Sequence, residues 1–279
     1  MIIFPSAKVN IGLNIIERRP DGYHNIETVF YPIGWRDALE VVPSSPSKSL
    51  ATPPKEEGIC TVSGAFVPDG DVENNLVMKA LRLIENDFQL DATDIFLQKN
   101  IPFGAGLGGG SSDGACMIRL LNDYFQLGLS MQQMERYASR LGADCPFFIQ
   151  NRPLFASGIG DEFEQIELDL TGYVFVVVKP DFFVPTSEAY ALITPCKPQL
   201  SLKELIKLPV NEWKKYIKND FEQPVGAHYP AIATIKRQLY EQGAVYASLS
   251  GSGSAVYGIF HTEITPSFSF PDGYIWRAF

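Results

Sequence analysis

The chain has 279 residues and a formal net charge of −9 at pH 7, and 46% of its residues are hydrophobic. This length suits one large domain or two moderate domains around a shared cleft, with the composition of an ordinary globular protein. The negative charge argues against a nucleic-acid or anionic-membrane partner but leaves room for a local basic pocket that binds an anion. No apolar run approaches the roughly 18 residues that a bilayer-spanning helix needs.

The cysteines and the N-terminus indicate the compartment. The N-terminal segment 1–16 is apolar but has no basic leader, which predicts a first strand and not a signal peptide. The cysteines show neither a C-x-x-C pair nor a nearby histidine, so we expect free thiols in a reducing cytoplasm and no zinc site. They are Cys60, Cys116, Cys145 and Cys196.

In the first 102 residues, the sequence predicts strands before and after a single helix. Short alternating runs on both sides of the turn sequence RPDGYH (19–24) predict a strand–loop–strand over residues 1–42. The segment 43–58, rich in Pro, Ser and Lys, predicts a mobile loop tip. Apolar residues at helical spacing predict a helix over 73–88, and a strand over 94–102 follows it.

Further elements follow on both sides of residue 154. The spacing of apolar residues predicts a helix that starts after Ser112, and Ser130 with Gln133 forms a capping-box pattern for a helix over 130–142. The pattern restarts near residue 154, which predicts two α+β halves. In the second half we expect strands over 173–178, 245–250 and 255–260, helices over 201–218 and 228–242, and a closing strand within 267–279.

The sequence IPFGAGLGGGSSDGACMIRLL (101–121) turns from a glycine run directly into a helix. Glycine loses more conformational entropy on folding than any other residue, so the run needs a reason. A helix N-terminus offers unpaired N–H groups and a partial positive charge, and preceding glycines let the backbone approach an anion closely. Ser111 and Ser112 add hydroxyls for a phosphate or for a metal that it carries. We therefore expect a phosphate-binding loop.

Of three alternatives to that interpretation, two stay open, and the Walker A loop fails. Residues 104–109 fit G-x-G-x-x-G, but a dinucleotide-binding fold would place an acidic residue after the next strand, whereas Asp123 falls in a predicted helix. A Walker A loop would need lysine at the position of Gly110. A glycine-rich loop without any ligand is the third alternative.

Five segments together resemble the GHMP small-molecule kinases in order and spacing. The resemblance covers about residues 3–260 and implies a two-domain α+β GHMP kinase fold. It implies a ribosomal-protein-S5-like ATP-binding domain over 1–154 and a ferredoxin-like substrate-side domain over 155–279. The segments are PSAKVNIGLNI (5–15), RPDGYHNIETVF (19–30), IPFGAGLGGGSSDGA (101–115), GADCPFFI (142–149) and SLSGSGSAVYGIF (248–260).

The resemblance also implies an activity. RPDGYH and ADCPFF narrow it to a kinase that uses ATP and Mg²⁺ to phosphorylate a small CDP-linked polyol. We expect a cytoplasmic monomer or weak homodimer and leave the magnesium ligands unassigned. The rivals are a GHMP kinase for mevalonate or homoserine, which has no nucleobase to bind, a silent binding module, and a Rossmann oxidoreductase.

The resemblance assigns roles to particular residues. Lys8 and Asp144 match the catalytic pair: Asp144 would accept the proton of the alcohol, and Lys8 would keep Asp144 ionised, because a nearby cation lowers a carboxylate pKa. The implied substrate positions are Asn10, Tyr23, His24, Phe30, Thr186 and Tyr190. The implied ATP positions are Asn75, Lys99, Pro102, Gly104, Ala105, Gly106, Leu107, Gly108, Gly109, Gly110, Ser111 and Ser112.

Three further features need a structure to explain them. Asp113 stands where the family often has Asn and would add a negative charge near the phosphates. The SGSGS segment (250–254) resembles the third family motif and is expected to pack beside the phosphate loop. NDFE (219–222) matches a family signature, for which the sequence offers no more than a role at a helix terminus.

Overall fold

A computed structural model describes residues 1–44, 58–67 and 70–279, so nearly all of the predicted loop tip 43–58 lies outside the described residues. The chain forms two compact units whose segments alternate along the sequence. The sequence predicted instead one boundary near residue 154, and that domain division stays a prediction. The first unit comprises 1–7, 35–103 and 109–151, and the second comprises 8–34, 104–108 and 152–279.

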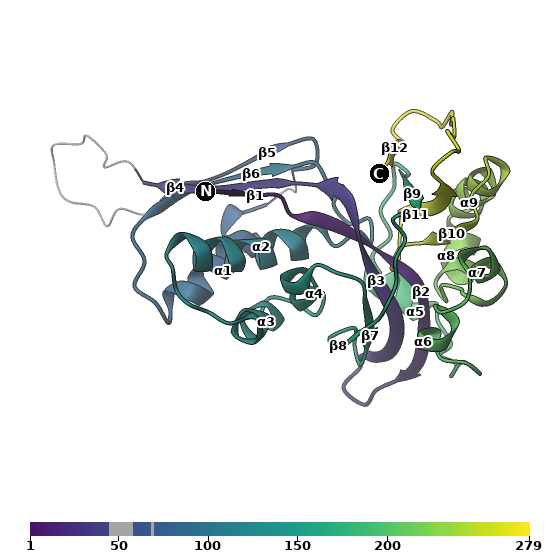
Figure 1. Ribbon diagram of the computed structural model, residues 1–279, viewed down its shortest axis with the longest axis horizontal. Coiled ribbons are helices and arrows are strands. Elements are labelled where there is room, and N and C mark those ends of the chain that lie inside the picture. The colour runs from purple at the N-terminus through teal and green to yellow at the C-terminus, as the bar shows by residue number, and fades with distance from the viewer. Residues whose placement is uncertain (45–57, 68–69) are drawn as a thin grey trace. The chain divides into compact units, whose positions relative to one another are not determined.

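In the first unit, the α-helices of the described residues lie on one face of a four-stranded sheet (Figure 1). The strand order is β1-β4-β6-β5, with β5 parallel to β6 and the other pairs antiparallel. The elements are β1 (Ile2–Ile3), β4 (Ala38–Pro43), β5 (Cys60–Gly64), β6 (Thr93–Lys99), the 3₁₀ turn Val72–Asn74, α1 (Leu76–Glu85), α2 (Gly109–Tyr124), α3 (Met131–Ser139) and α4 (Cys145–Gln150).

Local sequence explains where these helices begin. The Asn75 side chain accepts a hydrogen bond from the N–H of Val77 and so caps α1. The predicted capping box of Ser130 and Gln133 is confirmed at the start of α3. The helix predicted after Ser112 begins earlier, at Gly109, so the last glycines and both serines form its first turn. The sequence analysis missed the short helix α4, in which Pro146 fits the first turn because its nitrogen needs no partner there.

The second unit contains a long hairpin and an antiparallel sheet of order β10-β11-β9-β12. The predicted closing strand is confirmed, because Ile275–Ala278 pairs with β9. The hairpin strands β2 and β3 continue a few residues into the first unit and form a sheet of order β2-β3-β7-β8. The strands are β2 (Ser6–Arg18), β3 (His24–Arg36), β7 (Leu154–Ser157), β8 (Glu162–Gln165), β9 (Tyr173–Lys179), β10 (Tyr246–Leu249), β11 (Val256–His261) and β12 (Ile275–Ala278).

Prolines divide the helices of this unit more finely than periodicity predicted. The helix expected over 201–218 is two helices with Pro209 between them, and Pro230 stands before the helix expected over 228–242. Proline lacks the N–H that a helix interior needs. The helices are α5 (Thr186–Ala191), α6 (Leu202–Leu205), α7 (Val210–Tyr216), α8 (Glu222–His228) and α9 (Ala231–Glu241).

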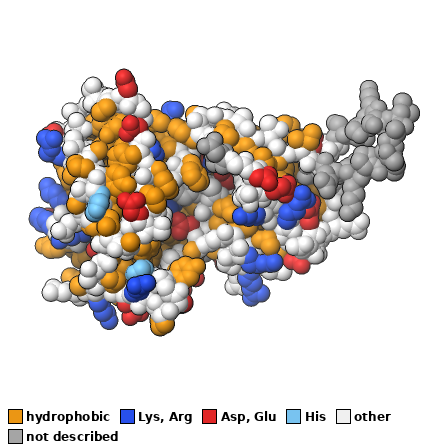
Figure 2. Space-filling model, turned by 180° about the vertical axis from the view of Figure 1, so that it is seen from behind, with side chains coloured by type: hydrophobic (Ala, Val, Ile, Leu, Met, Phe, Trp, Pro, Cys, Tyr) orange, Lys and Arg blue, Asp and Glu red, His pale blue; other side chains and the backbone are white. Residues whose placement is uncertain are grey.

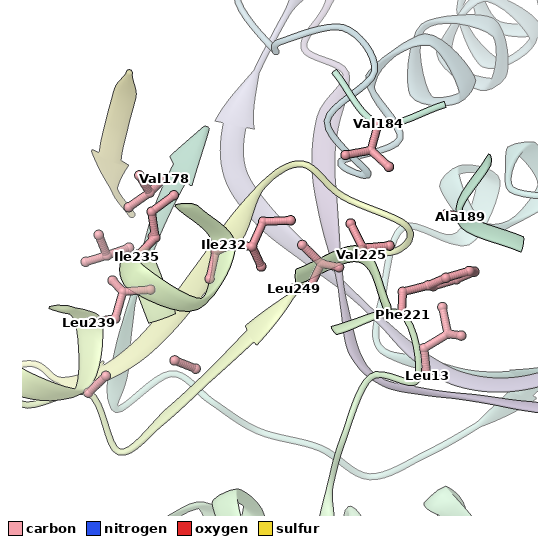
Figure 3. Close-up of a cluster of buried hydrophobic side chains, with 14 of the residues drawn as sticks. Leu13, Val178, Val184, Ala189, Phe221, Val225, Ile232, Ile235, Leu239 and Leu249 are labelled. Carbon is pink, nitrogen blue, oxygen red and sulfur yellow. The ribbon is translucent and has the colours of Figure 1, made fainter. Parts of the chain in front are cut away.

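The core of the second unit joins the sheet to its helices. Ile232, Ile235 and Leu239 of α9 point toward Val178 and Leu249 of the sheet (Figure 3). The α9 residues recur at three- and four-residue spacing, which is the apolar face of an amphipathic helix. Each fully buried aliphatic side chain contributes about 1.5–3 kcal/mol relative to exposure. This core therefore holds the strands that precede and follow the SGSGS segment.

Two predictions about residue chemistry can be checked directly. All four cysteines lie in the described ranges and are free thiols, as expected. None of the helices within 1–44, 58–67 and 70–279 combines the length and the apolar character that crossing a membrane requires.

Candidate active site

The glycine run leaves the backbone in conformations that side chains rarely allow. Gly104, Gly106 and Gly108 all have φ between +63° and +75°. A Cβ on Gly106 would lie 1.9 Å from the carbonyl oxygen of Ser250, and a Cβ on Gly104 would lie 2.4 Å from the Phe183 ring. Glycine is thus required at positions 104 and 106 both by the left-handed backbone and by close neighbours.

The first turn of α2 continues directly from this run. A Cβ on Gly110 would meet nothing within 4 Å, so the backbone there faces open space. The Ser112 hydroxyl is buried and, among the described residues, has no hydrogen-bond partner. A buried hydroxyl without a partner is costly, which suits a group that a ligand completes. The first turn of α2 therefore combines an exposed backbone position at Gly110 with a buried hydroxyl at Ser112.

The SGSGS segment packs against the loop, as the sequence predicted. The Ser250 hydroxyl donates to the Gly106 carbonyl oxygen at 2.8 Å and accepts the N–H of Asn10 at 3.3 Å. The N–H of Ala255 donates to the carbonyl oxygen of Ala105 at 3.1 Å. This turn therefore joins the glycine loop to strand β2.

The NDFE signature holds the same turn from its other side. The Asn219 amide donates to the carbonyl oxygens of Leu249 at 2.9 Å and Gly251 at 2.8 Å. Its oxygen accepts the N–H of Phe221, and Asp220 accepts the N–H of Ile15 at 2.7 Å. Sequence analysis quoted NDFE but could not find this role, because Leu249, Gly251 and Ile15 lie 30 or more residues away and contribute backbone groups, which leave no trace in side-chain type.

Lys8, Asn10 and Phe30 come together on the long hairpin. The Lys8 ammonium donates to Asn10 Oδ1 at 2.6 Å and lies 4.8 Å from the centroid of the Phe30 ring. The Asn10 amide donates to Thr28, a buried residue that the sequence analysis did not select. The N–H of Lys8 also donates to the carbonyl oxygen of Leu107 at 2.9 Å. Strand β2 thus presents a buried cation beside the glycine loop.

Two of the other predicted substrate residues, His24 and Tyr190, lie in a cluster of aromatic side chains. The rings of His24 and Tyr190 stack with centroids 4.8 Å apart and planes 20° apart, and Tyr190 packs edge-on against Phe221. Burial and the nearby Arg18 lower the pKa of His24, which favours the neutral imidazole. The Tyr23 side chain is 62% exposed, so its ring faces solvent. Many other hydrophobic side chains also lie on the surface of this unit (Figure 2).

Thr186 lies near the SGSGS turn. Its hydroxyl is 3.3 Å from the hydroxyl of Ser252. The exposed ring of Phe183, which lies against Gly104, stands three residues before it. Phe183 was not selected from sequence, where an exposed aromatic residue in a loop gives no signal of its own.

The catalytic pair predicted from sequence falls in two different units. Asp144 lies in the first unit, half-buried, directly before α4, whereas Lys8 lies in the second. The interaction between the two side chains therefore stays a prediction.

The remaining predicted ATP residues have defined partners in the first unit. Asn75 caps α1, and Pro102 is buried between β6 and the loop. The Lys99 ammonium contacts Asp37 and lies 2.6 Å from Asp113 Oδ2. Burial alone would lower the pKa of Lys99, but the two carboxylates outweigh it and raise that pKa. Burial raises the pKa of Asp113 well above its usual range, with Asp37 adding to the effect and Lys99 opposing it.

Two family models match parts of the chain. GHMP kinases N terminal domain matches residues 75–152, and GHMP kinases C terminal matches residues 201–267. The mixed α+β fold with mostly antiparallel sheets also excludes a Rossmann dinucleotide domain. The fold and the loop thus define a GHMP kinase.

Relatives narrow the class further. The chain is 53% identical over 265 residues to 4-diphosphocytidyl-2-C-methyl-D-erythritol kinase of Bacteroides thetaiotaomicron, covering 95% of this chain and 94% of the relative. It is 48% identical over 280 residues to the enzyme of the same name from Parabacteroides distasonis, covering 100% and 99%. The chain belongs to the 4-diphosphocytidyl-2-C-methyl-D-erythritol kinase family of GHMP kinases.

Solved structures agree with this placement. A crystal structure of 4-(cytidine 5'-diphospho)-2C-methyl-D-erythritol kinase superposes with a TM-score of 0.76 at 30% identity, covering 93% of this chain and 90% of that one. The mevalonate kinase of Methanococcus jannaschii superposes with a TM-score of 0.68 at 14% identity, covering 95% and 92%. The second likeness shows the shared fold alone.

Proposed function

We propose that this protein transfers the γ-phosphoryl group of ATP to the 2-hydroxyl of 4-diphosphocytidyl-2-C-methyl-D-erythritol, a step of non-mevalonate isoprenoid precursor biosynthesis. The observation that carries the proposal is the nearly full-length identity to enzymes named for this substrate. The stacked His24 and the exposed Tyr23 support it, because mevalonate and homoserine offer no nucleobase to contact.

The glycine loop and the first turn of α2 bind the triphosphate in this proposal. Accessible N–H groups and the partial positive charge of the helix start suit an anion. The ATP positions are those expected from sequence: Asn75, Lys99, Pro102, Gly104, Ala105, Gly106, Leu107, Gly108, Gly109, Gly110, Ser111 and Ser112.

Substrate binding falls to the second unit. Tyr23 and His24 contact the cytosine, for which an aromatic face beside a hydrogen-bonding ring is well suited. Asn10, Phe30, Thr186 and Tyr190 line the rest of the substrate. The stacking of His24 on Tyr190 favours this assignment, because it holds the imidazole in one orientation.

The reaction breaks the bond between the γ-phosphorus and the bridging oxygen of ADP and forms one to the oxygen of the alcohol. Asp144 accepts the proton of that alcohol, late in a loose transition state, and orients it. Lys8 stabilises the negative charge that develops on the transferred group. The hydrogen bond from Lys8 to Asn10 fixes where the ammonium points.

A magnesium ion would accompany ATP. The serine hydroxyls of the first turn of α2 fit a hard cation, which prefers oxygen ligands, and Ser112 has an oxygen without a partner among the described residues. When bound, the ion neutralises phosphate charge. Within the described part of the chain there is no group of three or more His, Cys, Asp or Glu residues that could hold a metal ion. We propose a cytoplasmic monomer or weak homodimer, which sedimentation at several concentrations tests.

Coupled ADP release tests the activity directly. The full-length protein is assayed with ATP and Mg²⁺ on three acceptors side by side: the cytidylyl substrate, mevalonate and homoserine. We expect turnover with the cytidylyl substrate alone. A higher kcat/KM for mevalonate or homoserine would overturn the substrate assignment while leaving the kinase class intact.

A further inference from the structure

Three buried charged side chains lie beneath the start of α2. The Lys99 ammonium contacts Asp37 and lies 2.6 Å from Asp113, and each of the three side chains is at most 5% exposed. An ammonium that faces solvent would be free to meet a phosphate. This one is already enclosed by two carboxylates, so its interactions are with the protein.

Asp37 fixes the chain where it leaves β6. Its Oδ1 accepts the N–H of Asn100 at 2.5 Å and the N–H of Ile101 at 2.8 Å. The N–H of Asp37 itself donates to the carbonyl oxygen of Pro5 at 2.9 Å, next to β1. Because Asp37 also contacts Lys99, one carboxylate holds the last residue of β6 and the two residues after it.

Asp113 fixes the place where the chain enters α2. It lies in the first turns of the helix, and its bond to Lys99 joins them to the end of β6. A Cβ on Gly109 would lie 2.9 Å from Ile101 Cγ2 and 3.5 Å from Lys99 Nζ. The two ends of the loop are therefore in contact, with Lys99 beside both.

The charges explain why two carboxylates are present. A helix N-terminus carries a partial positive charge, so an ammonium placed beside it is unfavourable without compensation. A buried ammonium also needs a partner to offset its lost hydration. Asp37 and Asp113 both supply such a partner, because each contacts the Lys99 ammonium. Burial also raises the pKa of the Asp113 carboxyl, while Lys99 opposes that shift.

We propose that Asp37, Lys99 and Asp113 are positioning residues that hold both ends of the glycine loop in place before ATP arrives. The inference rests on the proposed function in taking ATP as the loop's ligand. It deepens that function because the Lys99 side chain positions the glycine loop and does not itself contact phosphate. It also accounts for Asp113, because the carboxyl group of this residue contacts Lys99 inside the protein.

Hydrogen exchange of the nucleotide-free, full-length protein tests the proposal without any ligand. In Lys99→Met the amides of residues 100–109 should exchange at least about tenfold faster than in the unsubstituted protein, because the loop ends lose their link. Lys79→Met, an exposed lysine of α1, is the matched control and should leave these amides unchanged. Unchanged exchange of residues 100–109 in folded Lys99→Met would overturn the proposal.

Asp37→Asn is a milder second variant that decides the matter if Lys99→Met does not fold. It keeps an oxygen for the N–H groups of residues 100 and 101 but turns an amide donor toward Lys99. We expect the same amides to exchange faster, by a smaller factor. Protection equal to that of the unsubstituted protein would count against the proposal.

A double-mutant cycle on the KM for ATP separates positioning from contact. If Lys99 acts through Asp37, the double variant raises this KM no more than the worse single variant. Effects that multiply would show independent roles and contradict the proposal. If the unsubstituted protein turns over no ATP, the proposed function fails, and the exchange result still decides whether the three residues hold the loop.

Discussion

At the scale of single residues, the proposed site holds the Lys8 ammonium in a defined orientation. The Lys8 ammonium is buried, held by Asn10 and placed over the Phe30 ring, so its orientation is set before any substrate binds. Preorganised charges of this kind stabilise a transition state without reorganisation at the moment of reaction. Asp144 supplies the other half of the proposed chemistry from the first unit.

Asp144→Asn should lower kcat by roughly 10²–10⁴ with little change in the KM for ATP, because the amide orients the alcohol poorly and accepts no proton. Asp91→Asn, an exposed aspartate of the same unit, is the control and should keep full activity. Steady-state kinetics with both substrates measures the effect. Near-normal turnover by Asp144→Asn would remove Asp144 from its proposed role.

Tyr23→Ala should raise the KM for the cytidylyl substrate while sparing the KM for ATP, since the exposed ring is proposed to contact only the cytosine. A lost base–aromatic contact corresponds to about 1–3 kcal/mol. Tyr216→Ala is matched in type and in exposure, at 53% against 62%, and should change neither constant. Equal losses for both ligands in Tyr23→Ala would speak against a cytidine pocket.

The pKa of His24 predicts a pH dependence. Because burial and Arg18 lower that pKa from 6.5, the imidazole is neutral at pH 7 and gains its proton only as the pH falls below 6.5. The KM for the cytidylyl substrate should therefore be constant above pH 7 and change only in acid. A His24-dependent change centred above pH 7, absent from His24→Asn, would refute this.

At the scale of elements, one short turn supports the loop. SGSGS sits between β10 and β11, whose positions are fixed by the core of α9 (Figure 3). From there Ser250 bonds to Gly106, and Asn219 holds the turn in place. A rigid sheet thus controls the conformation of a glycine loop that would otherwise sample many states.

Asn219→Ala should lower the free energy of unfolding by about 1–3 kcal/mol, because it removes the amide that donates to the carbonyl oxygens of Leu249 and Gly251. The KM for ATP should rise with it, through the loosened turn. Urea denaturation measures the first effect, and Asn211→Ala, an exposed position of α7, should change stability by less than about 0.5 kcal/mol. Equal stability of the two variants would show that the turn does not depend on Asn219.

At the scale of the whole molecule, local sequence patterns predicted most of the helices and strands. Periodicity and capping residues predicted α1 and α3, and β-branched runs predicted β9 and β11, because these signals are local. The breaks at Pro209 and Pro230 were within reach of the same reasoning, since proline excludes a continuous helix.

Only part of the candidate site could be predicted from the sequence. The glycine run predicts a phosphate loop because the residues that would form the loop are consecutive. The partners of Lys99 lie 62 and 14 residues away and those of Asn219 lie 30 and 32 residues away, so no spacing rule could find them. The alternation of the two units along the chain is a property of long-range packing and has no local signature.

Phosphorus-31 NMR of the reaction product tests the central claim most directly. The full-length protein, ATP, Mg²⁺ and the cytidylyl substrate should give one new phosphomonoester resonance without three-bond proton splitting, because the tertiary carbon that bears the 2-hydroxyl carries no hydrogen. Consumption of the acceptor and formation of ADP should match it in amount. A resonance split by a carbinol proton, or ADP formed without any new ester, would contradict phosphoryl transfer to this hydroxyl.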